Sequence, residues 1–148
     1  LQLATYGATI ASDGNLYKPR FMTYATEVNS QEVVVTNAKE IKSTLPEKNA
    51  AYLDRVKQGF SACVSSGYCG DPMQPFAGQV SAKTGTAEVG DWTTANLVGY
   101  APSNAPTMAF ACSAPTSSIN DQSVSPNICS NMVMPEFIQK YFELYPAS

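Results

Sequence analysis

Histidine is absent from all 148 residues of this chain. A serine–histidine–aspartate triad, a cysteine–histidine pair and the common zinc sites that use histidine all require an imidazole. The chain can therefore form none of these sites unless another chain supplies the histidine. No two cysteines have the Cys-x-x-Cys spacing of a zinc site, so the sequence suggests no metal, and it suggests no other cofactor.

Charge and long apolar runs are also scarce. Charged residues make up 14% of the chain, the net charge is −3, and lysines and arginines do not cluster, which argues against binding of nucleic acid. No stretch approaches the roughly 20 apolar residues of a membrane span, and no signal-peptide pattern is found. Because the chain opens at Leu1 without an initiator methionine, we expect a processed or excised segment. Any membrane attachment would come through an anchor outside this sequence.

The four cysteines, Cys63, Cys69, Cys112 and Cys129, are candidates for two disulfides. Three pairings are possible, and we prefer Cys63 with Cys69 and Cys112 with Cys129 because each pair closes a short loop. Disulfides would indicate an oxidising, extracytoplasmic location. The alternative is four buried, reduced thiols in a cytosolic protein.

Hydrophobic periodicity predicts an α+β protein. Apolar residues at helical spacing predict three helices: residues 2–12, stopped by Gly14; a helix that follows a capping box at 44–47 and ends near Ser65; and residues 135–145, with an aromatic side packed on a sheet. Five strands are expected, at 21–28, 32–36, 79–89, 95–101 and 107–114. Short connections predict that the last three form an antiparallel meander. Residues 67–76 and 116–128 are expected to be loops, and a turn is expected at 90–91.

The strand expected at 79–89 carries the side chains best suited to binding a ligand. Lys83, Thr84 and Thr86 can each bind an anionic or carbonyl group, and Gly85 leaves the backbone bare, so that a ligand can lie against the strand. The tripeptide Lys-Thr-Gly alone is weak evidence, because a surface strand ending in a glycine turn would carry the same letters. Glu88 is expected to be an exposed residue at the strand's end rather than a general base.

Four blocks of sequence span nearly the whole chain: residues 1–19, 83–88, 96–102 and 133–137. Together they resemble the C-terminal part of penicillin-binding protein transpeptidase domains, and they follow that family's order. The likeness is to class B-like serine D,D-transpeptidases of the β-lactamase superfamily. It implies an antiparallel sheet packed with helices, as part of a β-lactamase/transpeptidase-like fold.

Two of the three family signatures, Ser-x-x-Lys, Ser-x-Asn and Lys-Thr-Gly, are lacking. No serine lies three residues before a lysine. Ser118–Asn120 and Ser125–Asn127 fit Ser-x-Asn as text, but they follow Lys-Thr-Gly, whereas the family places that motif before it. We therefore expect residues 1–148 to be the C-terminal portion of a single transpeptidase domain, without its Ser-x-x-Lys and Ser-x-Asn segments.

The resemblance implies serine acyl transfer on the D-Ala-D-Ala stem peptides of peptidoglycan, a reaction that β-lactams block. The hydroxyls of Thr84 and Thr86 would hold the substrate carboxylate, and Lys83 would add positive potential and position the serine of Ser-x-Asn. The backbone N–H of Thr86 would form half of the oxyanion hole.

The nucleophile and its lysine would come from an N-terminal segment or a companion chain that carries Ser-x-x-Lys. This portion alone would be inactive, and its parent would lie on the extracytoplasmic face of the bacterial membrane. One alternative is a non-catalytic extracytoplasmic interaction or sensor module on the same scaffold. Within the enzyme class, a carboxypeptidase or a β-lactamase is the weaker rival.

Overall fold

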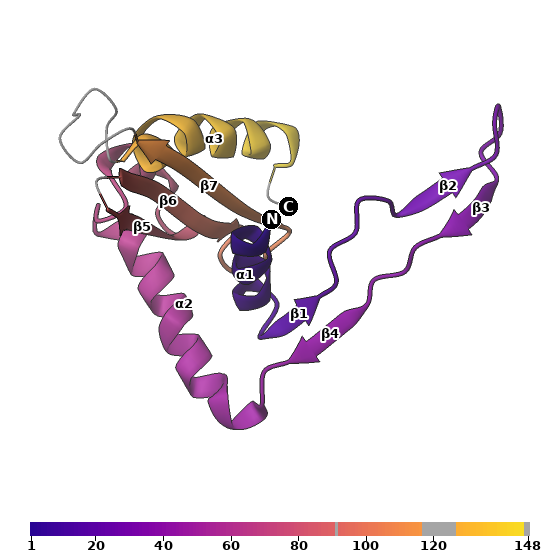
Figure 1. The fold of residues 1–148 in the computed structure, drawn as a ribbon, viewed down its shortest axis with the longest axis horizontal. Coiled ribbons are helices and arrows are strands. Elements are labelled where there is room, and N and C mark those ends of the chain that lie inside the picture. The colour runs from indigo at the N-terminus through magenta and orange to yellow at the C-terminus, as the bar shows by residue number, and fades with distance from the viewer. Residues whose placement is uncertain (91, 117–126, 147–148) are drawn as a thin grey trace.

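A three-stranded antiparallel sheet with helices packed against it forms the body of the molecule (Figure 1). The computed structural model describes residues 1–90, 92–116 and 127–146. The strands are β5 (Ser81–Val89), β6 (Trp92–Ala101) and β7 (Met108–Thr116), in the order β5-β6-β7. The predicted α+β class and meander are confirmed, and β6 begins three residues earlier than expected. Of the turn expected at 90–91, Gly90 is a turn residue with a φ angle of 60°, and Asp91 lies outside the described residues. Most of the loop expected at 116–128 also lies outside them, including the two Ser-x-Asn text matches except for Asn127.

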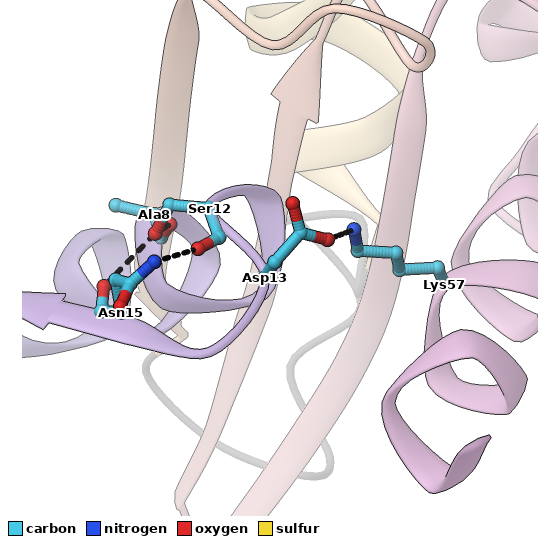
Figure 2. A network of polar contacts seen from close by, with 5 residues as sticks. All are labelled: Ala8, Ser12, Asp13, Asn15 and Lys57. Atoms are coloured by element: carbon cyan, nitrogen blue, oxygen red, sulfur yellow. Dashed lines mark hydrogen bonds and ion pairs between the residues drawn. The ribbon is translucent and has the colours of Figure 1, made fainter. Parts of the chain in front are cut away.

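Helix α1 (Gln2–Ala11) ends one residue before the predicted end at Ser12. Its last turn is followed by Asp13 and Gly14, with φ angles of 56° and 85°. The left-handed backbone that stops the helix therefore begins one residue before the expected glycine, at an aspartate, a residue type that tolerates this region better than most. Asn15 Nδ2 then donates to the Ser12 carbonyl at 2.8 Å and fixes the exit from the helix (Figure 2).

An ion pair joins this turn to the second long helix. Lys57 of α2 (Ala50–Ser65) donates to a carboxylate oxygen of Asp13 (Figure 2). Because the Asp13 side chain is 81% exposed, the pair contributes at most about 1 kcal/mol. The ion pair therefore adds little to the stability of the fold.

Residues 15–44 form a two-stranded arm that extends away from the sheet (Figure 1). At its base, β1 (Asn15–Tyr17) pairs antiparallel with β4 (Ile41–Thr44), and further out β2 (Tyr24–Thr26) pairs with β3 (Val33–Thr36). The two strands predicted at 21–28 and 32–36 are present but shorter. The pairing of β1 with β4 was not predicted.

The predicted capping box at 44–47 is wrong. Thr44 lies in β4 opposite Asn15, and its hydroxyl donates to Asn15 Oδ1 at 2.9 Å instead of capping a helix. A short 3-10 turn, η1 (Glu47–Asn49), precedes α2, which has no side-chain cap. The Thr44 hydroxyl therefore bonds across the β1–β4 pair and does not cap a helix.

Two segments are more regular than expected. The 3-10 helix η2 (Asp71–Phe76) lies in the stretch predicted as loop, and the π-helical turn η3 (Cys129–Val133) leads into α3 (Met134–Leu144). Both are tied down by disulfides, Cys63–Cys69 before η2 and Cys112–Cys129 at the start of η3. This is the pairing preferred from the sequence.

Each face of the sheet carries its own apolar cluster. On one face, Ile10 of α1 and Phe60 of α2 pack with Val98 and Tyr100 of β6. On the other, the cluster draws on α2, η2, η3, α3 and all three strands, with these members: Cys63, Val64, Cys69, Met73, Val80, Ala82, Leu97, Ala101, Phe110, Cys129, Met134 and Ile138. Both clusters share β6, which is therefore the central strand in packing as well as in order.

The prediction that the aromatic side of α3 packs on the sheet is only partly right. Met134 and Ile138 are buried and Phe142 packs against the same cluster, which is the stripe that residues four apart make on a helix. Phe137 and Tyr145 are 51% and 64% exposed. Phe137 is turned by about 100° from Ile138, and Tyr145 lies beyond the last helical residue.

Candidate functional site

The four predicted site residues lie on β5, which is an edge strand. Within the described part of the chain, β5 pairs only with β6. Its beginning is covered, because Ser81 and Ala82 are buried and the sulfur of Cys69 lies 3.5 Å from the Ala82 carbonyl oxygen. Lys83 is the first exposed residue of the strand.

The register places the site residues on both faces of β5. Lys83 and Gly85 lie opposite Val98 and Asn96, and Thr84 and Thr86 lie opposite Leu97 and Ala95 on the other face. Thr84 is half-buried, and the other three are exposed. Glu88 is also exposed, near the strand's end, as expected from the sequence.

The ammonium group of Lys83 interacts with a carbonyl and with an aromatic ring in the described part of the chain. Its Nζ donates to the Thr84 carbonyl at 2.8 Å and lies 5.4 Å from the centroid of the Tyr68 ring. Sequence reasoning did not single out Tyr68. The available signal was an aromatic residue inside a disulfide loop that lies upstream of the Lys-Thr-Gly strand, with η2 between them.

Gly85 faces open space. A Cβ built on it would meet no atom within 4 Å, apart from its own chain neighbours. Packing within the described chain therefore gives no reason for a glycine at this position. A ligand that needs close contact with the bare backbone would give one.

A small cavity lies behind the strand, between β5, β6 and the start of η3. Its volume is about 10 Å³, and its lining includes Thr84, Thr86, Asn96 and Ser130. Such a volume holds about one water molecule, so a peptide-sized ligand would have to bind along the outer edge of β5. The Cys112–Cys129 disulfide fastens η3, which forms the back of this cavity, to β7.

A much larger cavity lies elsewhere. It measures about 580 Å³ and is lined by α1, β1 and β4 and the segments that follow them. It shares no residue with β5, and apolar atoms dominate its wall. Its lining does include a lysine and hydroxyls, Lys42, Ser43 and Thr44 of β4. They lie outside the Lys-Thr-Gly strand that the sequence singles out, so the size of the cavity does not make it the candidate site.

Other features of chemical interest are few. Lys140, donating to Glu143 Oε2 at 2.8 Å, holds the pKa of the Glu143 carboxyl below its ordinary value. This pair lies on the exposed side of α3. Among the described residues no three His, Cys, Asp or Glu side chains form a metal-binding group, and no helix is long and apolar enough to span a membrane.

Comparisons with known proteins show which family this chain belongs to. The sequence model described as penicillin binding protein transpeptidase domain matches residues 1–134. The chain is 26% identical to penicillin-binding protein 2A of Bacillus subtilis (strain 168) over 159 aligned residues, which cover 97% of the chain and 22% of that relative. The chain therefore belongs to the penicillin binding protein transpeptidase domain family, and the family predicted from its sequence blocks is confirmed.

Solved structures give the same fold. Penicillin-binding protein 2B from Streptococcus pneumoniae (strain R6) superposes with a TM-score of 0.75 at 25% identity, covering 99% of this chain and 25% of that one. A D,D-transpeptidase domain of a peptidoglycan glycosyltransferase from Eggerthella lenta has a TM-score of 0.64 at 20% identity, covering 97% and 31%. The chain thus spans between about a fifth and a third of these relatives.

Proposed function

We propose that residues 1–148 are the C-terminal portion of a single D,D-transpeptidase domain and that they supply its substrate- and β-lactam-binding half. The observation that carries this proposal is the Lys83-Thr84-Gly85-Thr86 run, exposed except for the half-buried Thr84, on an edge strand without a second strand partner in the described chain. Family membership supports the reaction class, acyl transfer at a serine. The parent enzyme acts on peptidoglycan stem peptides ending in D-Ala-D-Ala.

The free edge of β5 suits a peptide-like ligand. An extended peptide or its β-lactam mimic can add to such an edge as a further strand, with main-chain hydrogen bonds fixing its register. In an antiparallel edge strand, alternate residues direct their N–H and C=O groups to the open side. Thr84, whose carbonyl accepts from Lys83, has the same parity as Thr86. This supports a Thr86 N–H that points outward, where it forms half of the oxyanion hole.

The remaining roles follow from charge and hydroxyl placement. The hydroxyls of Thr84 and Thr86 bind the terminal carboxylate, and Lys83 adds positive potential and positions the serine of a Ser-x-Asn motif. The nucleophile and its lysine come from a Ser-x-x-Lys segment or chain that assembles with this one. The family's reaction needs no metal, and the parent works on the extracytoplasmic face of the cell membrane, where both disulfides would be stable.

Lys83→Ala in the full-length protein tests the site. The charge-assisted hydrogen bond that Lys83 would make is worth roughly 1.5–3 kcal/mol, so the acylation rate with a fluorescent penicillin should fall roughly ten- to hundredfold. Lys48→Ala is the matched control, because Lys48 is also exposed but lies on η1. Equal rates for Lys83→Ala and the wild type would remove Lys83 from the site.

A denaturing gel of penicillin-labelled protein tests the division of the domain. If this chain is purified together with a companion, the label should appear on the companion, which carries the nucleophile. A covalent label on the 148-residue chain itself would show that the chain contains its own nucleophile and would overturn this part of the proposal.

A further inference from the structure

Tyr68 lies on a short loop whose path is tightly fixed. The loop joins α2 to η2 and is closed by the Cys63–Cys69 disulfide, and the Cys69 N–H donates to the Cys63 carbonyl at 2.8 Å. Both cysteines are buried. Gly67 and Gly70, on either side of Tyr68 and Cys69, have φ angles of 77° and 99°, a left-handed backbone that favours glycine. The loop therefore presents Tyr68 at a defined place although the side chain itself is 77% exposed.

That place is beside Lys83. The Lys83 Nζ lies 5.4 Å from the centroid of the Tyr68 ring while it donates to the Thr84 carbonyl. The face of a phenol ring attracts an ammonium group at this distance. A lysine on an exposed strand loses considerable rotamer entropy when it is held in one place, and the ring together with the carbonyl offsets part of that loss.

We propose that Tyr68 is a positioning residue that holds the Lys83 ammonium at the open edge of β5. The contact between Tyr68 and Lys83 does not depend on the proposed function. Only its effect on a bound ligand, through Lys83, rests on that function. A purely structural role for Tyr68 does not fit its exposure, because the ring belongs to neither apolar cluster. A contact between exposed groups of this kind predicts a roughly two- to fivefold effect on acylation.

A double-mutant cycle in the full-length protein tests the inference, with the acylation rate by a fluorescent penicillin as the readout. Tyr68→Ala should slow acylation roughly two- to fivefold, and Tyr68→Phe, which keeps the ring, should not. Tyr52→Ala is the matched control, because Tyr52 is 72% exposed and lies near the start of α2, whereas Tyr68 follows its end. In the Lys83→Ala background, Tyr68→Ala should cause no further loss.

The outcomes separate the two proposals. The same additional loss in the Lys83→Ala background would show that Tyr68 acts independently of Lys83, and would overturn the inference. A slow Lys83→Ala protein with a fully active Tyr68→Ala protein would also overturn it, and would leave the proposed function standing. If Lys83→Ala has no effect on acylation, the proposed role of Lys83 falls.

NMR of the full-length protein tests the contact without any activity. The protons next to the Lys83 ammonium should show a ring-current shift that is lost in Tyr68→Ala and retained in Tyr68→Phe. Lysine resonances that are identical in the wild type and Tyr68→Ala would overturn the inference whatever the acylation data show.

Discussion

Replacing Gly99 with alanine tests how closely β5 is set against β6. A Cβ at Gly99 would lie 2.5 Å from the Ser81 carbonyl oxygen, 2.5 Å from Phe110 Cζ and 2.9 Å from Ala82 Cβ. The Ser81 oxygen belongs to the backbone of β5, so rotating a side chain cannot relieve that contact. Overpacking costs roughly 1–3 kcal/mol, whereas removing a strand glycine recovers only roughly 0.5–1 kcal/mol. The cost of the clash exceeds the gain from removing the glycine, so we expect the free energy of unfolding to fall by about 1–2 kcal/mol.

Urea denaturation followed by far-UV circular dichroism measures this loss, with two other glycines as controls. A Cβ at Gly85 or at Gly59 would meet nothing within 4 Å. Gly85→Ala should leave stability unchanged or slightly higher, and Gly59→Ala, inside α2, should raise it by roughly 0.5–1 kcal/mol. If Gly99→Ala is as stable as Gly85→Ala, the two strands do not pack as closely as described, and the reasoning fails.

Three further predictions concern α3 and the disulfide at the start of η3. Replacing both cysteines of the Cys112–Cys129 pair with alanine should cost about 3 kcal/mol from its loop length, measured by urea denaturation without reductant; an unchanged midpoint would contradict a closed disulfide. Ile138→Ala, at a fully buried position, should lose about 2–5 kcal/mol, whereas the adjacent, half-exposed Phe137→Ala should lose no more than about 0.5 kcal/mol; similar losses in thermal melts would refute the orientation of α3. Lys140→Ala should raise the pKa of Glu143 toward its ordinary value in an NMR titration. Because the pKa of Glu143 is lowered in the folded protein, the stabilisation from this pair is present at neutral pH and is lost as the pH falls through that pKa.

Local sequence patterns predicted the parts of the fold that depend on local periodicity. The helices α1, α2 and α3 and the meander follow from apolar spacing and short connections, and their ends are off by a few residues. The contact between Asn15 and Thr44 is different, because it joins residues 29 positions apart. No local pattern indicates that pairing, and it redirected a hydroxyl that otherwise has the form of a helix cap.

The candidate site also has a part that the sequence predicted and a part that it did not. The sequence shows which side chains the Lys-Thr-Gly strand carries, but alternation does not predict their exposure. Ser81 lies on the same face as Lys83 and Gly85 and is buried, whereas Thr86 on the other face is exposed. Tyr68 reaches Lys83 only because a disulfide and two glycines bend the preceding chain toward it. The position of a ring 15 residues upstream is a property of that bend, and composition and spacing alone do not encode it.

The arm has a practical consequence that follows from where it closes. The pairing of β1 with β4, continued by the Lys18 N–H donating to the Glu40 carbonyl at 2.9 Å, brings the two ends of the arm together at its base. Residues 27–32, at the tip, lie far from β5 (Figure 1). A dye, an affinity tag or a short insertion placed at this tip can therefore immobilise or report on the protein while the Lys-Thr-Gly strand remains unaltered.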